Sequence, residues 1–205
     1  MRIKILIGLL VVCSFSVEAQ LVNQFKKLGC AEKWWVITHP FVANKTAQLS
    51  LEVKIVANSD TIKTLLGKDG NGGALDAFRH TYWMAILTKE IGSRRALKLG
   101  EAHEKKNKQD FKKGRLEDGT IPDSVSIQMD LFNNQVGSSL VVKKERVSIS
   151  ELLERVIEQI CSGKTLVVAK NEKAQSLDIN GNVLIREEWE GNWDSGRVLV
   201  PSSCN

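Results

Sequence analysis

The chain lacks the sequence patterns that most directly indicate a function. It has 205 residues but only three histidines, three prolines and one tyrosine. It contains no CxxC pair, so its cysteines fit no common zinc module or redox motif. The segment His103-Glu104-Lys105-Lys106-Asn107 has asparagine where HExxH requires a second histidine. This difference excludes the zinc-protease motif.

Long apolar runs are missing beyond the N-terminus. Basic residues flank the start of an apolar run over residues 3–12, and Val17-Glu18-Ala19 offers a small-residue cleavage site. These features are typical of a signal peptide over residues 1–19, so we expect an exported protein, periplasmic or extracellular. No later stretch approaches the roughly 20 apolar residues of a transmembrane helix, which predicts a mature chain without a membrane span.

Strong charge of one sign is also absent. The formal net charge is only +5, which is too mild for a nucleic-acid-binding arm, and no nucleic-acid partner is expected. Basic residues nevertheless gather between residues 94 and 115. Such a run usually forms a solvated helix face, and the alternative is attraction to an anionic lipid or a cell-wall polymer.

Three cysteines remain after the expected cleavage, namely Cys30, Cys161 and Cys204. Because their number is odd, an oxidising compartment allows at most one pair within the chain and leaves one thiol. Cys204, next to the last residue, can join the tail to Cys30 or to Cys161. The sequence does not choose between these pairings.

The periodicity that is present is mainly helical up to residue 162. Helices are expected over residues 20–28, 41–58, 74–91, 94–105, 123–141 and 151–161. Their expected N-caps include Ser93, Asp123 or Ser124, and Ser150. After Gly163, apolar runs at 166–168 and 198–200 predict short strands, and 183–185 is either a hairpin arm after Asn180-Gly181 or a partner of the first run.

We therefore expect a mainly α fold. A helical domain would occupy residues 20–162, and a small β-rich C-terminal appendage would occupy residues 163–205.

Polar residues stand on helix faces where core residues are expected. Two groups share the spacing i, i+3, i+4 and i+7: Asp76, Arg79, His80 and Trp83, then Asp130, Asn133, Asn134 and Gly137. Residues at these spacings lie on one face of a helix. A third helical stretch between them ends in His103 and Glu104. Such a stripe is either a site or an unusually well-satisfied buried network.

One interpretation of the stripe is catalytic. His80 acts as a base, Asp76 or Asp130 orients its ring, and Asn133 or Asn134 stabilises developing charge. Arg79 would contribute to binding, and Trp83 would be either a core residue or a wall of the pocket.

A second interpretation is a divalent metal site. His80 and His103, with Asp76, Glu104 or Asp130, offer the nitrogen and oxygen ligands of a zinc-like centre that keeps an open position for water. In either interpretation we expect His80, His103 and Asp130 to lie within reach of one another.

Three sequence blocks carry a resemblance to a known family. They are Asp76-Ala77-Phe78-Arg79-His80-Thr81-Tyr82-Trp83, Ala102-His103-Glu104 and Met129-Asp130-Leu131-Phe132-Asn133-Asn134-Gln135-Val136-Gly137. Together they resemble an uncharacterised bacterial domain family, found in secreted and toxin-like proteins, with the pattern DAFRHxYW, HE, DxxNNxxG. The resemblance covers about residues 71–140 and implies no particular activity. It marks these positions for testing: Arg79, His80, His103, Glu104, Asp130, Asn133 and Asn134.

Two functions from different classes are consistent with the sequence. The first is a secreted hydrolase acting on phospholipid or cell-wall material. The second is a non-catalytic secreted or surface binding module in which the polar groups fix helix register. A water-accessible pocket at the three blocks favours the enzyme, whereas a sealed and fully bonded cluster favours the module.

Overall fold

The structure is a computed structural model that describes residues 25–204 of the chain. The expected signal peptide over residues 1–19 lies outside this range, as does the start of the helix expected over residues 20–28. Within the range the protein is mainly helical, with a small two-stranded antiparallel sheet near the C-terminus, which confirms the expected fold class.

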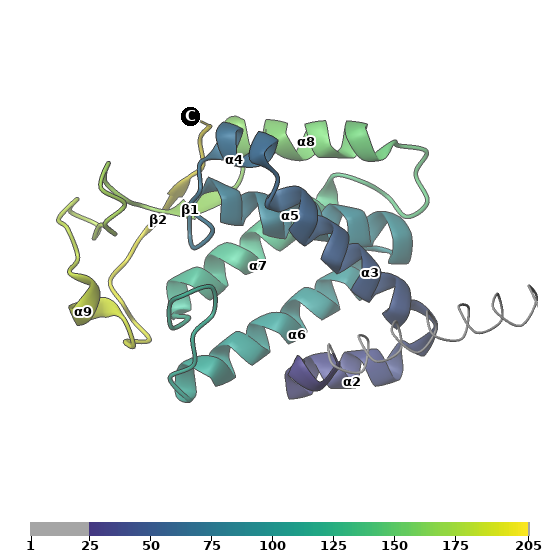
Figure 1. The fold of residues 1–205 in the computed structure, drawn as a ribbon, viewed down its shortest axis with the longest axis horizontal. Coiled ribbons are helices and arrows are strands. Elements are labelled where there is room, and N and C mark those ends of the chain that lie inside the picture. Colours follow the sequence, from purple (N-terminus) through teal and green to yellow (C-terminus); the bar gives the residue numbers. More distant parts are fainter. Residues whose placement is uncertain (1–24, 205) are drawn as a thin grey trace, which may run out of the picture.

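The helices follow one another along the chain and pack into one body (Figure 1). They are α2 (Cys30–Thr38), α3 (Pro40–Ala57), α4 (Asp60–Leu66), α5 (Ala74–Ile91), α6 (Ser93–Lys112), α7 (Ser124–Ser139), α8 (Ile149–Cys161) and the short α9 (Arg186–Trp189). The strands are β1 (Leu166–Val168) and β2 (Leu199–Pro201).

Helix α5 lies at the centre and contacts α3, α6, α7 and α8 (Figure 1). Phe78, Met84 and Leu87 on this helix have no exposed surface. A helix packed on most of its sides leaves only a small part of its surface to solvent. Asp76 and His80 of α5 are therefore buried in the interior.

Several helix ends differ from those expected. Helix α6 continues to Lys112 rather than ending at Lys105. In its last turns Asn107 and Asp110 face the interior, the nearby lysines lie on the outside or at the edge, and Lys106 pairs with Asp110 at 2.7 Å. Gly92, not Ser93, is the N-cap of α6.

The N-caps of α7 and α8 can also be compared with the expected ones. Ser148, not Ser150, caps α8 by accepting the Glu151 N–H at 3.0 Å. Asp123 caps α7, one of the two caps expected there, by accepting the Ser126 N–H at 2.8 Å.

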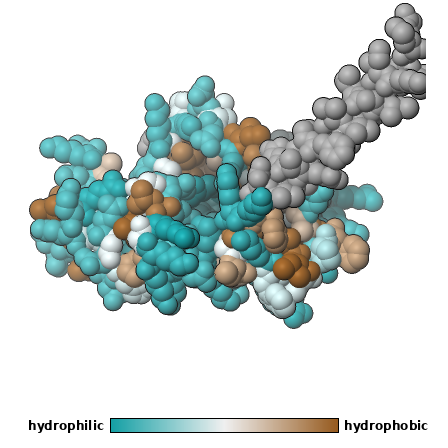
Figure 2. Space-filling view, turned by 60° about the horizontal axis from the view of Figure 1, so that its bottom comes forward, coloured by the Kyte–Doolittle hydropathy of each residue, from teal (hydrophilic) through white to brown (hydrophobic). Residues whose placement is uncertain are grey.

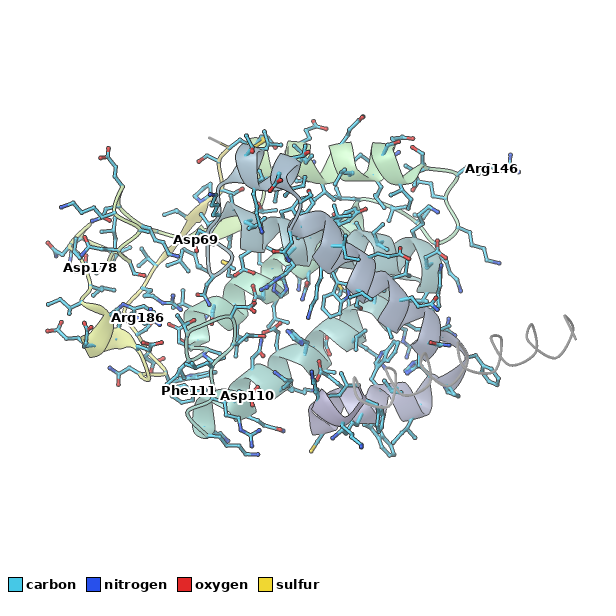
Figure 3. All side chains as sticks on the ribbon, viewed as in Figure 1. Asp69, Asp110, Phe111, Arg146, Asp178 and Arg186 are labelled. Atoms are coloured by element: carbon cyan, nitrogen blue, oxygen red, sulfur yellow. A yellow bond between two sulfur atoms is a disulfide. The ribbon has the colours of Figure 1, made fainter. Side chains whose placement is uncertain are left out.

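The tail after α8 is joined to the helical body at several points. β1 pairs with β2 in the register Leu166↔Pro201, so residues 183–185 are not the partner of β1; they contribute only an isolated bridge between Val183 and Leu177. A disulfide links Cys161 to Cys204, and Cys30 is free and exposed among the described residues. The labelled Asp178 and Arg186 lie at the opposite end of the molecule from Arg146 (Figure 3).

Within residues 25–204, no helix combines the length and the apolar character that crossing a membrane requires.

Candidate functional site

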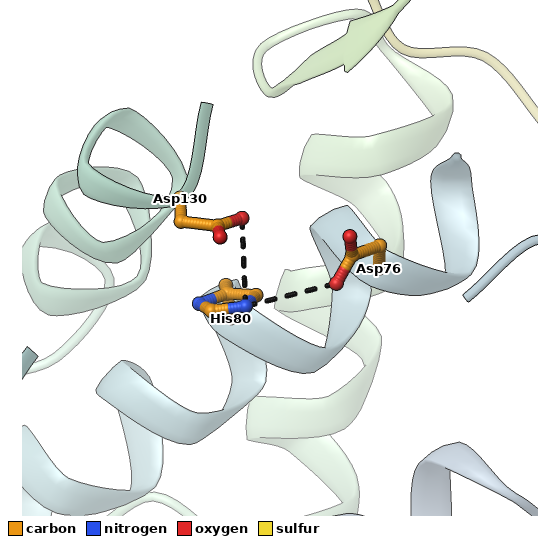
Figure 4. A group of neighbouring side chains, drawn as sticks. All are labelled: Asp76, His80 and Asp130. Atoms are coloured by element: carbon orange, nitrogen blue, oxygen red, sulfur yellow. Dashed lines mark ion pairs between the residues drawn. The ribbon is translucent and has the colours of Figure 1, made fainter. Parts of the chain in front are cut away.

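A buried cluster of one histidine and two aspartates lies between α5 and α7 (Figure 4). The His80 Nε2 atom is 3.4 Å from Asp130 Oδ1 and 3.6 Å from Asp76 Oδ1. His80 is 4% exposed, and the two aspartates are 5% exposed. Asp76 and His80 meet because they are one turn apart on α5, while Asp130 approaches from α7.

The cluster is sealed but its hydrogen bonds are incomplete. His80 Nδ1, Asp130 Oδ1 and both amide atoms of Asn134 have no hydrogen-bond partner among the described residues. An unpaired polar group in the interior costs about 1–3 kcal/mol, and native proteins contain few of them. A network that served only to hold helices together would be expected to satisfy these groups.

Burial controls the charges of the cluster. It raises the pKa of Asp130 well above its usual value, and the nearby Asp76 and Glu104 carboxyls raise it further. Burial also raises the pKa of Asp76, although Arg79 opposes this. The pKa of His80 is lowered by burial and by Arg79, which makes the neutral ring the stable form. A neutral imidazole nitrogen thus faces two desolvated carboxyl groups.

The same geometry suits a metal cation. One ligand atom from each of Asp76, His80 and Asp130 can be chosen so that all three lie within 4.8 Å of one another. Two atoms that are each about 2.1 Å from one cation at a tetrahedral angle are roughly 3.4 Å apart. The 3.4 and 3.6 Å separations measured from His80 Nε2 match that spacing.

Arg79 positions Asp76 instead of presenting a free guanidinium. Its Nη2 donates to Asp76 Oδ1 at 2.6 Å, and its Nη1 donates to Asp118 Oδ2. The other oxygen of Asp76 accepts the Gly72 N–H at 2.7 Å. Asp76 is therefore held from two directions with Oδ1 toward His80.

His103 lies beside the cluster, with its ring centroid 6.3 Å from that of His80. Its Nδ1 is 2.9 Å from Glu32 Oε1, and its Nε2 is 3.2 Å from Glu117 Oε1. Although burial alone would lower the pKa of His103, these two carboxylates raise it to about 10. An imidazolium with both nitrogens engaged has no lone pair for a metal, so His103 as it lies in this structure offers no ligand nitrogen.

Glu104 is buried near the two aspartates and has one unsatisfied oxygen. Its Oε2 accepts from Asn107 at 3.0 Å, while its Oε1 has no partner among the described residues. Burial raises the pKa of Glu104 to about 7, against the opposing charge of His103. A carboxyl group with this pKa can accept or donate a proton near neutral pH.

The two asparagines of α7 have different roles in the structure. Asn133 Oδ1 accepts from the Leu166 N–H at 2.9 Å, and Asn133 Nδ2 donates to the Leu166 carbonyl at 2.9 Å. Both ends of this amide hold β1, so Asn133 is not free to stabilise charge as the sequence suggested. Asn134 lies close enough to His80 to favour a higher pKa of the ring against the larger effect of burial, but its amide makes no hydrogen bond to His80 in this structure.

Trp83 closes one side of the site. Its indole Nε1 donates to Ser50 Oγ on α3 at 2.8 Å. The Trp83 ring meets the His80 and His103 rings edge-on, at centroid distances of 6.5 and 5.7 Å. Trp83 also packs against the hydrophobic core, so it combines a core position with a place beside the cluster.

The α6–α7 loop (residues 113–123) adjoins the cluster through its charged residues. Glu117 bonds to His103, Asp118 bonds to Arg79, and the Thr120 hydroxyl accepts from Asn71 at 2.6 Å. Two open hollows on the described surface, one around Tyr82 and one around Gly92, contain no residue of the His80 cluster.

Residues 33–164 match a family described as a domain of unknown function, DUF6973. The chain belongs to this family. No curated protein and no solved structure matches the chain. The DUF6973 match includes all three sequence blocks and the whole of the buried cluster, whereas the tail after residue 164 lies outside it.

The sequence analysis missed three acidic residues that lie around the His80 cluster and its neighbour His103. Glu32 lies on α2, and Glu117 and Asp118 lie in the α6–α7 loop, so none shares a helix face with the polar stripe. Glu32 also accepts the Gly29 N–H at 2.7 Å. An acidic residue three positions after the N-cap of a helix is the one local sequence feature that points to this contact. The loop acids had no such signal.

Proposed function

We propose that the protein is an exported, metal-dependent hydrolase in which Asp76, His80 and Asp130 hold a divalent cation. The observation that supports the proposal is a buried histidine nitrogen at metal-ligand spacing from two carboxyl groups, in a cluster where His80 Nδ1 and Asp130 Oδ1 have no hydrogen-bond partner among the described residues. A cation would compensate the desolvated carboxylates and use the lone pair of the neutral ring.

The residues around the cation provide the rest of a hydrolytic site. A divalent cation held by three protein groups keeps a position for water and lowers the pKa of that water. Glu104, with a pKa of about 7, is the candidate for proton transfer. Asn134 lies near the His80 ring, and a small shift of its unpartnered amide would let it bond the second ring nitrogen and direct Nε2 toward the cation.

Access to the site would require movement of the α6–α7 loop. This loop holds Asp118 against Arg79 and Glu117 against His103, and a sealed cluster with these contacts intact cannot admit substrate. We infer that release of the two contacts opens the site, as in other enzymes that close a loop over their chemistry.

Export is part of the proposal. The N-terminal pattern over residues 1–19 and the Cys161–Cys204 disulfide both fit an oxidising, extracytoplasmic compartment. Substrates in that compartment include phospholipid and cell-wall material.

Elemental analysis of the purified protein tests the metal site. We expect about one equivalent of a divalent transition metal in the wild type and a loss of most of it in Asp130→Asn. Asp110→Asn is the matched control, because Asp110 is a buried α6 acid paired with Lys106 outside the cluster. Wild-type protein that binds no divalent metal, even after it is added, would contradict the proposal.

Hydrolysis is tested separately on phospholipid vesicles and on isolated cell-wall material. We expect one of these to be cleaved by wild type and by Asp110→Asn, but not by Asp130→Asn. Metal binding without cleavage of either material would favour the alternative function, a non-catalytic binding module with a structural metal. The burial of the whole cluster is the observation that favours this alternative.

A further inference from the structure

A basic groove lies where α5 ends, α6 begins and α7 ends. Its volume is about 790 Å³, and its lining contains Arg94, Arg95, Lys98 and Lys143 but no acidic residue. These four side chains are exposed and form no ion pair among the described residues. The aliphatic part of the Lys143 side chain passes over Gly92 at the start of α6.

The backbone adds to the positive potential of this groove. Gly92 caps α6 without a side chain, and Ser93, the first residue of this 20-residue helix, lines the groove. The first N–H groups of a helix have no partner within the helix and carry the positive end of its dipole. The groove thus combines four exposed cationic side chains with the positive end of a helix, which favours phosphate groups.

An exposed apolar corner adjoins the groove. His39, which lines the groove, lies between α2 and α3, and Ile37 and Phe41 flank it in the sequence. Phe41 is fully exposed, Ile37 is 59% exposed and Trp34, one turn earlier on α2, is 67% exposed. The face turned forward in Figure 2 carries hydrophobic residues within a mostly hydrophilic surface.

We propose that this combined surface, the basic groove and the α2–α3 corner, docks the protein onto a bilayer that contains anionic phospholipid. Large apolar side chains beside Lys and Arg are the pattern of proteins that lie in the interfacial region of a membrane. Each cation near an anionic surface contributes about 1 kcal/mol, and the apolar corner adds an attraction that does not depend on salt. A soluble or cell-wall polyanion would use the cations but would leave Phe41 without a partner.

This proposal does not depend on the proposed hydrolytic function. His80 lies within α5 and Gly92 directly follows that helix. The twelve residues between these positions correspond to roughly 18 Å along the helix axis. The α6–α7 loop lies at the other end of α6. Docking would therefore hold the body at the membrane while the loop over the His80 cluster remained away from the groove.

Vesicle flotation tests the docking surface, using the exported protein with its N-terminus verified by mass spectrometry. We expect binding to vesicles with about a third anionic phospholipid, little binding to phosphatidylcholine vesicles, and weaker binding in 0.5 M salt. Arg94→Glu/Lys98→Glu/Lys143→Glu should reduce the affinity at least about 100-fold. Its matched control, Lys54→Glu/Lys164→Glu/Lys173→Glu, changes the net charge equally at exposed lysines outside the groove and should retain most of the binding.

Phe41→Ser distinguishes a membrane from a polyanion. Because Phe41 is fully exposed, its loss should leave folding intact, and we expect it to weaken vesicle binding roughly tenfold or more. Binding that needs the groove cations but is unchanged in Phe41→Ser would assign the groove to a polyanion and overturn the proposal. Equal loss of binding in the groove variant and in its charge-matched control would also overturn it, as would wild-type protein that floats with neither kind of vesicle.

Discussion

Gly137 of α7 touches the backbone of α5 at Thr81. A Cβ atom placed on Gly137 would lie 2.1 Å from the Thr81 carbonyl oxygen, well inside van der Waals contact. Thr81 follows His80 directly, and Gly137 lies two turns after Asp130. The close approach of the two helices therefore sets the position of Asp130 relative to His80.

Gly137→Ala is expected to separate α5 from α7. Because the contact is with backbone and not with a flexible side chain, the helices must move, and we expect a loss of about 3 kcal/mol or more in the free energy of unfolding. Urea unfolding measures this. Gly70→Ala is the control, since a Cβ there would meet nothing within 4 Å, and it should change stability little. Equal stability of the two variants would show that the helix contact does not need glycine.

Metal removal is expected to destabilise the protein through the His80 cluster. A ligand that binds only the folded state stabilises it by about 2.7 kcal/mol at 100 times its Kd. A chelator should therefore lower the Tm of wild type and of Asp110→Asn by several degrees. The Tm of Asp130→Asn should not respond, because it would already lack the cation. Chelator sensitivity that persists in Asp130→Asn would place the metal elsewhere.

Loosening the α6–α7 loop should expose the cluster without unfolding the core. The double variant Glu117→Gln/Asp118→Asn removes the charges that face His103 and Arg79. We expect amide hydrogen exchange within residues 114–122 to accelerate about tenfold while α5 remains protected. Glu187→Gln on α9 is the control, since this exposed acid forms no ion pair among the described residues. Unchanged exchange in the loop would mean that other contacts hold it closed.

The charge of His103 should make stability depend on pH. Its pKa is about 10 in the folded protein and about 6.5 in the unfolded chain, so its contribution is complete below pH 6.5 and is lost as the pH rises toward 10. A quarter of the His103 side chain is exposed, so we expect a contribution on the order of 1–2 kcal/mol. The difference in unfolding free energy between wild type and His103→Gln should shrink over that interval. A difference that stays constant would contradict a charged His103.

The Cys161–Cys204 disulfide should hold the tail to the helical body. It closes a loop over a sequence separation of 43 residues, for which chain entropy corresponds to about 4 kcal/mol. Cys204→Ser should lower the free energy of unfolding by 2–4 kcal/mol and should abolish the effect of a reductant on stability. Cys30→Ser, at an exposed free thiol, is the control and should behave like wild type. If reductant destabilised Cys204→Ser as strongly as wild type, the pairing would be wrong.

The helical fold and the central cluster were largely predictable, because local spacing carries their signal. The expected helix over residues 74–91 matches α5, and Asp76 and His80 meet as residues one turn apart must. The meeting of His80 with Asp130 was expected from two stripes of the same spacing, and the structure brings them to 3.4 Å.

The partners of His103 and Asn133 were not predictable in this way. His103 meets Glu32 across 71 residues, and Asn133 meets Leu166 across 33 residues, and no local pattern encodes either pairing. These distant contacts engage both ring nitrogens of His103 and both amide atoms of Asn133. In each case the side chain that the sequence marked as chemically active is occupied by a structural partner.

The sequence by itself determined which polar residues share a helix face, because helical periodicity places those side chains together regardless of what that face meets. Only the tertiary structure decided which of them are free. Burial by α6, α7 and the α6–α7 loop shifts the pKa values, and long-range pairing occupies His103 and Asn133 while it leaves His80, Asp130 and Glu104 unsatisfied. Those effects depend on which groups surround each side chain in space, and the order of residues along one helix does not predict them.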